Sequence, residues 1–465
     1  MLALIAAGPN DDRRGKGGGG ATVEPAVVPP YRVNVWLCRP GAESVTASVL
    51  AWENMEASIA FGESPDKLTH HTESLQLTAG EPKNYVIEGL KPDSAYFYQL
   101  VYRVAPEKPV RDEIRSLHTR RAVTSGFTFD IQADSHLDVS SNTHVYQKTL
   151  SNILADKPDF MVDLGDTTMV DKFGSFYTRS ESQYRAQRYY LGGIAHSVPI
   201  LLTLGNHDGE QGSRLNGQPD SMPLWSVGMR KMYFPNPEPG GIYTGNTKPE
   251  QGAGLLQDYC AWEWGSALFI VLDPFWPTRE RKGDDNWSMT LGEAQYRWLS
   301  KTLEDSKSPF KFVFIHHLVG GLGRDARGGV KTAPYMEWGG KNADGTDGFA
   351  QHRPGWEMPI HQLLVKSHVS AVFHGHDHLY AKEELDGIIY QEVPQPSHPD
   401  GGIRSAEEYG YTGVILGSSG HLRVTVDPMK SLVEYVRASV PGVTKDDVKN
   451  GTVAHSYTIN SRLNP

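Results

Sequence analysis

The stretch Leu201-Leu202-Thr203-Leu204-Gly205-Asn206-His207-Asp208 joins an apolar, β-favouring run to a glycine and three polar residues. Such a run is typical of a buried strand, which would deliver Asn206, His207 and Asp208 together at its carboxyl end. Open α/β sheets place their ligand sites at this edge. The three side chains offer a neutral metal ligand, a titratable imidazole and a carboxylate that can orient it. The stretch therefore predicts a functional site at a strand end.

Four further strand-like runs end in residues of the same chemical kind. The motifs that follow them are Asp134-Ser135-His136, Gly165-Asp166, His316-His317 and His374-Gly375-His376-Asp377-His378. Each motif alone has an ordinary explanation, since Gly-Asp is usually a turn and Asp-x-His often arises by chance. The His-x-His of the last motif is more specific, because alternate residues of an extended backbone share one side. The five strand ends together predict one composite site.

The residue types of the five motifs favour metal ions. Carboxylates, imidazoles and one amide oxygen, without a thiolate, suit ions such as Zn, Mn and Fe rather than a structural cysteine-zinc site. Seven ligands are too many for one ion and suit two ions that share a bridge. Asp166 lies between the other groups in chain order and is the natural bridging carboxylate.

Strand-like and helical patterns alternate from about residue 124, which predicts an α/β fold. The expected strands are 127–133, 159–164, 262–273, 310–315, 369–373, 431–438 and 452–459. The expected helices are 144–155, 180–195 and 356–367. Two glycine-rich stretches, 209–257 and 320–355, exceed ordinary loop lengths and are candidate substrate-binding loops.

Short β-rich runs separated by turn residues occupy residues 29–119 and predict a small all-β sandwich. The turn that enters Tyr96-Phe97-Tyr98 matches a layout in which a buried tyrosine hydroxyl ties a sandwich corner, so the segment resembles a fibronectin type III-like module. Residues 1–28 are expected to be a disordered tail or the remnant of a signal peptide. The remnant favours export to the periplasm or the extracellular space, and the missing basic front leaves a cytoplasmic location open.

The length, charge and composition of the chain limit its domain organisation and its possible partners. The chain of 465 residues is too long for one core and predicts two or three domains. Its net charge of −10 and pI near 6.0 argue against a nucleic-acid-coating surface, so no stable nucleic-acid complex is expected. No apolar run reaches the roughly 18 residues that span a bilayer. Cys38 and Cys260 favour two buried thiols over a bridge between domains.

The five motifs, in this order over residues 127–380, resemble the signature of the calcineurin-like metallophosphoesterases. A β-sandwich in front of the catalytic domain is similar to the arrangement of the purple acid phosphatases. The resemblance implies a four-layer α/β/β/α domain at 124–465 that hydrolyses small phosphate monoesters or diesters by attack of a metal-bound hydroxide. A scaffold or binding protein without turnover is the alternative. That alternative predicts gaps in the ligand set, and no ligand position is vacant.

The resemblance also implies a role for each residue. One metal (Fe, Mn or Zn) would be held by Asp134, His136 and His378. The other would be held by Asn206, His316 and His376, with Asp166 as the bridge. His316 is preferred to His317 by its position in the motif, although Leu318 replaces the family's proline.

The resemblance gives the remaining polar residues of the central motif a part in catalysis. His207 would protonate the leaving group or steady the phosphate, and Asp208 would orient the His207 imidazole. The purple branch carries a metal-binding tyrosine three residues after the bridging aspartate, where this chain has Met169. The resemblance therefore implies a colourless metal centre.

Selectivity would come from the two long loops. Their arginines are candidates to hold phosphate oxygens, and solvated surface charge is the ordinary alternative for each. These arginines are Arg214, Arg324, Arg327 and Arg353.

Overall fold

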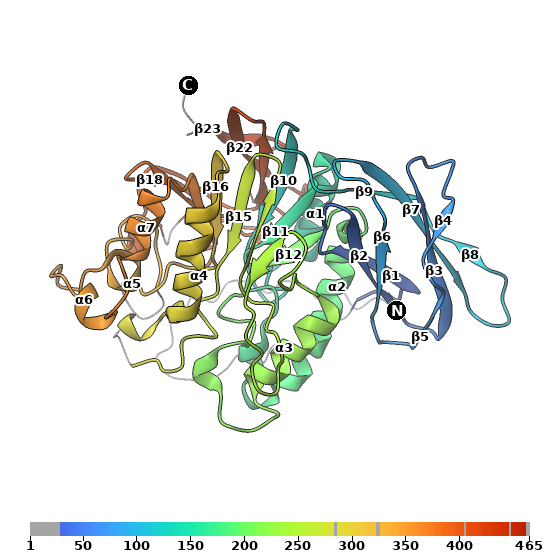
Figure 1. Ribbon diagram of the computed structural model, residues 1–465, viewed down its shortest axis with the longest axis horizontal. Coiled ribbons are helices and arrows are strands. Elements are labelled where there is room, and N and C mark those ends of the chain that lie inside the picture. The colour runs from blue at the N-terminus through green and yellow to red at the C-terminus, as the bar shows by residue number, and fades with distance from the viewer. Residues whose placement is uncertain (1–27, 283–285, 322–325, 404–405, 446–447, 462–465) are drawn as a thin grey trace.

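The computed structural model describes residues 28–282, 286–321, 326–403, 406–445 and 448–461 (Figure 1). Residues 1–27 of the expected tail lie outside this part of the chain. Two large sheets form the centre of the molecule, and an all-β region precedes them in the sequence. The mixed α/β class expected from the sequence is confirmed.

The N-terminal region consists of two small sheets packed on a shared apolar core. One sheet contains β1 (Val33–Cys38), β2 (Ser44–Ala51) and β6 (Lys83–Glu88). The other contains β3 (Met55–Gly62), β4 (His70–His71), β5 (Leu75–Leu77), β7 (Ala95–Arg103), β8 (Val110–Arg111) and β9 (Arg115–His118). The Tyr96 hydroxyl accepts a hydrogen bond of 3.0 Å from the Lys91 backbone, which is the corner contact expected from the sequence. The fibronectin type III-like assignment stays a prediction.

The first central sheet is parallel on one side and antiparallel on the other. Its order is β12 (Ile200–Leu202), β11 (Phe160–Asp163), β10 (Phe127–Gln132), β21 (Gly420–Val426), β22 (Lys430–Arg437) and β23 (Val453–Asn460). β10, β11 and β12 are mutually parallel, so their carboxyl ends reach one edge. β12 is shorter than the apolar run that predicts it, because the chain bends into a loop after Leu202.

The second central sheet has eight strands. Its order is β13 (Tyr243–Gly245), β14 (Cys260–Trp264), β15 (Ala267–Val271), β16 (Phe310–Phe314), β17 (Ala371–His374), β19 (Ile388–Glu392), β18 (Tyr380–Leu385) and β20 (Val414–Leu416). β15, β16 and β17 run parallel to one another. The carboxyl ends of β16 and β17 carry the two remaining histidine motifs.

Two helical layers cover the outer faces of these sheets. The helices of the chain are α1 (Thr143–Asp156), α2 (Glu181–Ala195), α3 (Met222–Tyr233), α4 (Gly292–Asp305), α5 (Met336–Gly339), α6 (Phe349–His352), α7 (Ile360–Lys366) and α8 (Ala406–Tyr409). α1 and α2 share a core with β11 and β12, while α4 and α7 share one with β15 and β16. The helix expected at 356–367 begins only after Pro359, whose ring excludes the preceding residue from the helix.

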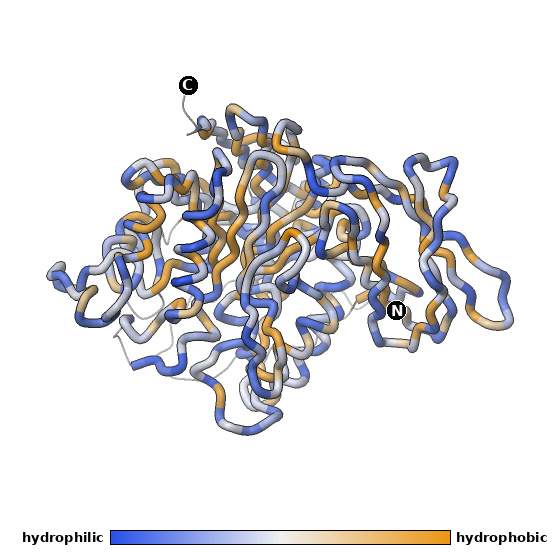
Figure 2. Tube along the Cα trace, viewed as in Figure 1, coloured by the Kyte–Doolittle hydropathy of each residue, from blue (hydrophilic) through white to orange (hydrophobic). Residues whose placement is uncertain are grey.

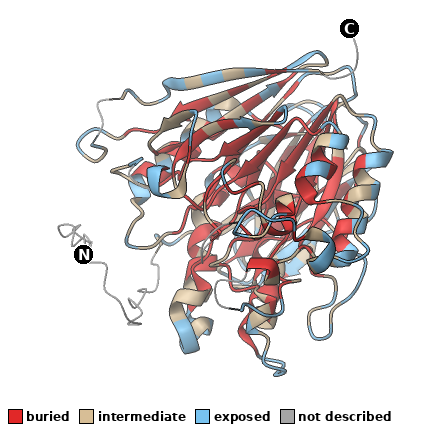
Figure 3. Cartoon of the chain, turned by 90° about the vertical axis from the view of Figure 1, so that its left-hand side faces the viewer, coloured by how far each residue is buried: buried red, intermediate tan, exposed pale blue. Residues whose placement is uncertain are grey.

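The core between the two sheets is aromatic. Phe129 of β10 stacks on Phe160 of β11 at a centroid distance of 5.6 Å and meets Phe269 of β15 edge-on at 5.0 Å. All three side chains are fully buried, and burying each contributes about 1.5–3 kcal/mol. Hydrophobic and buried residues accordingly concentrate on the central strands, with polar ones on the outlying loops (Figures 2 and 3). The result is an α/β/β/α arrangement of four layers.

The N-terminal sheets and the central domain are joined by a shared core. Trp36 of β1 and Leu50 of β2 are fully buried in the same cluster as residues of α1, α2 and β11. Arg188 of α2 is also fully buried and donates hydrogen bonds to Asn34 Oδ1 at 2.8 Å and to the Ser48 carbonyl at 2.6 Å. The β region is therefore packed into the rest of the molecule.

The structure also bears on the predictions for the two cysteines, the two long loops and membrane-spanning segments. Cys38 and Cys260 are both buried free thiols, as favoured. The stretch 209–257 contains the unexpected helix α3, which starts with proline at its first turn, and 320–355 contains α5 and α6. Among the described residues, no helix combines the length and the apolar character needed to cross a membrane.

Candidate metal centre

The five motifs converge at one edge of the two central sheets. They follow β10, β11, β12, β16 and β17, and six of their side chains that are able to hold a metal ion form two groups. One group is Asp134, His136 and His378, and the other is Asp166, His316 and His376. Within each group the ligand atoms lie within 4.8 Å of one another. These are the two sets expected from the sequence, apart from Asn206, whose Oδ1 lies 3.0 Å from His316 Nε2.

Asp166 lies between the two groups. Its Oδ2 is 3.6 Å from His136 Nε2 in the first group and 3.3 Å from His316 Nε2 in the second. His136 and His378 in turn approach Asp134 Oδ1 at 3.6 Å and 3.4 Å. One carboxylate thus faces both sets of imidazoles, which is the position required of a bridging ligand.

The backbone at these ligands is held in an uncommon conformation. Five of the predicted ligands have positive φ angles, namely Asp134 (59°), His136 (55°), Asp166 (51°), His376 (83°) and His378 (60°). Non-glycine residues rarely occupy this region, and such strain persists where the surrounding structure imposes it, often at functional sites. The bends turn the side chains from successive strand ends toward a common point.

Glycines in the motifs allow the loops to approach closely. A Cβ atom on Gly165 would collide with the backbone of Gly205, and one on Gly205 would collide with the backbone nitrogen of Asp166. A Cβ on Gly375 would lie 2.6 Å from Asp134 Oδ2. The glycines of Gly-Asp, Gly-Asn-His-Asp and Gly-His-Asp-His are therefore needed because the metal-ligating loops pack against one another.

The donor set and its unpartnered atoms fit metal ions. Asp134 Oδ1 and both ring nitrogens of His136 are buried and have no hydrogen-bond partner among the described residues. Burial raises the pKa of Asp134 and of Asp166, but the surrounding histidines outweigh this effect and hold both pKa values well below the ordinary value. The carboxylates are thus kept ionised, and their oxygens converge with imidazole nitrogens in a buried space. This arrangement suits borderline divalent or trivalent ions.

His207 lies beside this centre but has a different partner from the one expected. Its Nε2 is 3.9 Å from Asp166 Oδ2, and its Nδ1 bonds to Asp171 Oδ1 at 2.8 Å. Asp171 belongs to the 3₁₀ helix η1 (Val170–Ser180). The expectation that Asp208 orients His207 is wrong, because the Asp208 carboxylate binds backbone N–H groups instead.

Asp208 instead holds together the backbones of two motif loops. Its carboxylate accepts hydrogen bonds from the backbone N–H groups of Asp166, Thr168 and Gly205, at 3.0, 2.7 and 2.8 Å. Burial and the nearby Asp166 raise its pKa to about 7. The carboxylate therefore fixes the bends of the Gly-Asp and Gly-Asn-His-Asp loops.

The two other histidines of the motifs lie outside the ligand groups. His317 packs edge-on against Phe275, with its Nδ1 bonded to the Leu318 carbonyl, whereas His316 lies in the second ligand group. Burial and the neighbouring His316 lower the pKa of His317 to about 3. His374 is buried, and its Nδ1 lies 2.6 Å from Glu392 Oε2. Glu392 also accepts a hydrogen bond from the Asp377 backbone, so the His374–Glu392 pair helps to hold the last motif in place.

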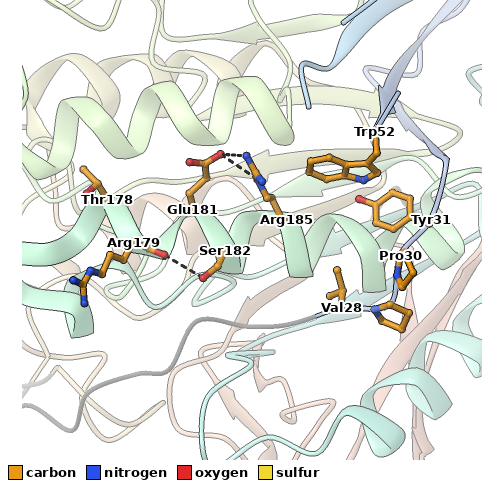
Figure 4. Close-up of a pocket in the computed structure, with 10 residues that line it drawn as sticks. Val28, Pro30, Tyr31, Trp52, Thr178, Arg179, Glu181, Ser182 and Arg185 are labelled. Atoms are coloured by element: carbon orange, nitrogen blue, oxygen red, sulfur yellow. Dashed lines mark hydrogen bonds and ion pairs between the residues drawn. The ribbon is translucent and has the colours of Figure 1, made fainter. Parts of the chain in front are cut away.

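A cavity of about 560 Å³ opens beside the ligand His378. Arg327, Gln395, Tyr409 and Lys445 are among its lining residues. A second cavity, of about 570 Å³, lies between Tyr31 and Trp52 of the N-terminal region and Arg185 of α2 (Figure 4). None of the described residues that line this second cavity is a predicted metal ligand. Proximity to the ligands, rather than volume, identifies the first cavity as the candidate substrate site.

The four arginines of the long loops differ in their positions and contacts. Arg327 lines the cavity beside His378 and donates to Asp377 Oδ1 at 2.8 Å. Arg214 lies near the site, with its Nη2 3.4 Å from Asp171 Oδ2. Arg353 binds the buried Glu337 and anchors its own loop. Arg324 lies outside the described residues.

Comparison with known protein families shows which family carries these motifs. A family model described as calcineurin-like phosphoesterase matches residues 127–380, which is more than half of the chain. The chain belongs to the calcineurin-like phosphoesterase family. The match begins at β10 and ends at the start of β18, and so includes all five motif loops.

Two solved structures share the fold of this calcineurin-like phosphoesterase. A purple acid phosphatase from yellow lupin (Lupinus luteus) superposes with a TM-score of 0.60 at 14% identity, over 92% of this chain and 74% of that one. The structure of PhoD superposes with a TM-score of 0.64 at 13% identity, over 92% of this chain and 90% of that one. No curated protein matched the sequence. The similarity in layout to a purple acid phosphatase, with an all-β region before the family domain, is confirmed at the level of the fold. Met169, three residues after Asp166, is fully buried.

Proposed function

We propose that this calcineurin-like phosphoesterase is a dinuclear-metal hydrolase of small phosphate monoesters or diesters. The observation that supports the proposal most directly is the position of Asp166, whose Oδ2 lies 3.6 Å and 3.3 Å from histidine nitrogens of the two ligand groups. Asp134, His136 and His378 would hold one ion, and Asn206, His316 and His376 the other. Two such ions activate water and stabilise charge on a phosphoryl group.

His207 supplies the proton that the leaving group needs. Its Nε2 faces the centre, while its Nδ1 is held by Asp171 at 2.8 Å. The hydrogen bond to the carboxylate fixes the orientation of the imidazole, so that its other nitrogen is presented toward the centre. The ester oxygen leaves as an alcohol when Nε2 donates this proton.

The alcohol portion of the ester is proposed to occupy the cavity beside His378. Arg327 and Lys445 give its wall positive charge, partly balanced by Asp377 and Asp400. The ring of Tyr409 lies under the Arg327 guanidinium at 5.0 Å and offers an apolar surface. This mixed lining suits a small ester that has polar groups beyond its phosphate.

The proposal is tested by metal content and hydrolysis together. Protein reconstituted with Mn, Zn or Fe should hydrolyse para-nitrophenyl phosphate, its bis-ester or nucleotides, and the preferred ester identifies the substrate class. Asp166→Asn should bind less metal and lose turnover, because the carboxylate that faces both groups is gone. Full activity of chelator-treated Asp166→Asn protein would refute the dinuclear proposal. Two bound ions without turnover on the whole panel would instead favour a scaffold protein.

A further inference from the structure

A second cluster of ionisable side chains lies on the helical side of the first central sheet. It consists of Asp130 in β10, Asp156 at the end of α1 and His421 in β21, with ligand atoms within 4.8 Å of one another. Phe129 and Ile131 face the core between the sheets, so Asp130 faces α1 from the opposite side. The cluster is therefore separate from the motif loops at the sheet edge.

Asp130 is the unusual member of this cluster. Its side chain is fully buried, and neither of its carboxylate oxygens has a hydrogen-bond partner among the described residues. Its Oδ2 points toward His421, at 3.9 Å from Nε2. Buried carboxylates are normally paired, hydrogen-bonded or bound to a metal, because removing an isolated charge from water is costly.

The surrounding charges leave the cluster negative. His421 Nε2 lies 2.8 Å from Asp156 Oδ2, and the other oxygen of Asp156 accepts a 2.6 Å hydrogen bond from Arg423. Arg423 also donates to Glu434 at 2.9 Å. Asp156 and Glu434 pair with the guanidinium of Arg423, and Asp130 does not. With Asp130 ionised and the imidazole neutral, three carboxylates and one guanidinium leave an excess of two negative charges. One divalent cation would balance this excess.

We propose that Asp130, Asp156 and His421 bind a divalent cation of the zinc or manganese class. Two carboxylate oxygens and one imidazole nitrogen form a donor set that these ions accept. Arg423 would hold the Asp156 carboxylate from behind, as hydrogen-bonded groups commonly do for metal-ligating carboxylates. The ion would tie the end of α1 to β10 and β21. Its role would be structural. Because β10 continues directly into Asp134 and His136, an ion that fixes β10 would also help to hold the first motif in place.

A protonated Asp130 is the competing explanation. Burial and the neighbouring Asp156 raise the pKa of Asp130 well above its ordinary value. Protonation would remove the charge, but it would leave the carboxyl group without a hydrogen-bond partner among the described residues. The two explanations differ in metal content, and Asp130→Asn mimics the neutral form.

Metal content per chain tests the proposal. The full chain, Asp130→Asn and His421→Gln would be loaded with Zn²⁺ or Mn²⁺, passed over chelating resin and measured by plasma mass spectrometry. Each variant should retain one ion fewer per chain than the unmodified protein. The matched control is His361→Gln, because His361 is a buried histidine bonded to Asp386 at 2.9 Å and belongs to none of the ligand groups. Equal metal content in all four proteins would overturn the proposal.

A second measurement separates this site from the motif centre. Metal-free Asp166→Asn protein would be titrated with Co²⁺, whose visible absorption reports its ligand geometry. Asp166→Asn should bind one Co²⁺ more than the double variant Asp166→Asn/His421→Gln, with the corresponding absorption band. Identical Co²⁺ binding and spectra for the two proteins would refute the site, whatever the activity of the motif centre.

Discussion

At the scale of single residues, the site depends on how each ionisable side chain is held. His207 and Asp208 are neighbours in sequence, yet their side chains serve different purposes. Asp208 turns inward and binds three backbone N–H groups, while His207 turns outward and is held by Asp171. The proposed proton donor, His207, and its hydrogen-bond partner, Asp171, thus come from separate segments, the loop after β12 and η1.

The first prediction concerns this His207–Asp171 pair. His207→Asn should lower turnover by about 10²–10⁴-fold, as expected when a general acid is removed. The loss should be greater for alkyl phosphates, which have poor leaving groups, than for para-nitrophenyl phosphate. Asp171→Asn should show the same dependence on the leaving group with a smaller loss, because the imidazole remains. Steady-state rates across a series of esters measure both effects.

Metal content is the control for that series. Both variants should retain the ions of the unmodified protein, because neither side chain belongs to a ligand group. If the two variants lost turnover equally for good and poor leaving groups, His207 would not be the proton donor.

At the scale of elements, α2 carries the contact that joins the N-terminal sheets to the central domain. Arg188 is fully buried and binds oxygen atoms of Asn34, Ser48 and Tyr233, with no carboxylate among these partners. Its guanidinium also lies 5.2 Å from the centre of the Trp36 ring. A buried cation held by neutral oxygens depends on every one of these contacts.

The second prediction compares Arg188 with its neighbour Arg185. Arg188→Met should lower the free energy of unfolding by about 3 kcal/mol, because several buried acceptors lose their donor. Arg185→Met should cost less than about 1 kcal/mol, because Arg185 forms a half-exposed pair with Glu181. Urea unfolding monitored by circular dichroism measures both. Similar losses in the two variants would show that the buried contacts of Arg188 add little.

The third prediction concerns pH and His196, which follows α2 directly. Burial, together with the nearby Arg115, lowers the pKa of His196 to about 4. Between pH 6.5 and pH 4 the unfolded chain takes up a proton that the folded chain excludes, so stability falls as the pH falls through this window. After allowance for partial exposure, the loss at pH 5 is about 1 kcal/mol.

Unfolding midpoints at pH 7 and pH 5 measure that loss. His196→Gln carries no titrating group at this position and should show a correspondingly smaller decrease between the two pH values. An equal decrease in the variant would assign the pH dependence to other residues.

The elements that the sequence predicts well are those with regular local patterns. Apolar runs ending in Asp, His or Asn locate the strand ends that meet at the site. The ligand groups implied by the family resemblance match the two clusters of converging side chains, apart from Asn206. α3 is missed because proline and glycine surround it in a stretch that reads as a loop. Asp171 is missed because it lies 36 residues from His207 and has no motif of its own. Contacts of this kind exist only once the chain has folded.

At the scale of the whole molecule, the N-terminal β region and the central domain form one packed unit. Trp36 and Leu50 lie in a cluster that also contains residues of α1, α2, α3, β11 and β12. The sequence suggests separate modules, because short β-rich runs in the first part give way to alternating strand and helix patterns in the second. It carries no local signal that apolar residues on the outer face of β1 and β2 cover the neighbouring helices.

The fourth prediction follows from this shared core. Removal of residues 1–120 should expose the apolar faces of α1 and α2, so the remaining chain should bind a hydrophobic dye, aggregate and melt at a lower temperature. In the full chain, Trp36→Ala should lower stability by about 3–5 kcal/mol through the cavity that it leaves. Dye binding and thermal melting measure both. A soluble truncated protein with an unchanged melting temperature would show that the two parts are independent.

The left-handed backbone at the metal ligands has a practical consequence. The bends at Asp134, Asp166 and their neighbours are maintained by protein contacts such as those of Asp208, which do not involve an ion. Metal ions would then bind to a site whose backbone conformation is already formed, with little reorganisation of the chain. Ions of different elements could be exchanged in one preparation, so their intrinsic reactivities could be ranked within an unchanged protein environment.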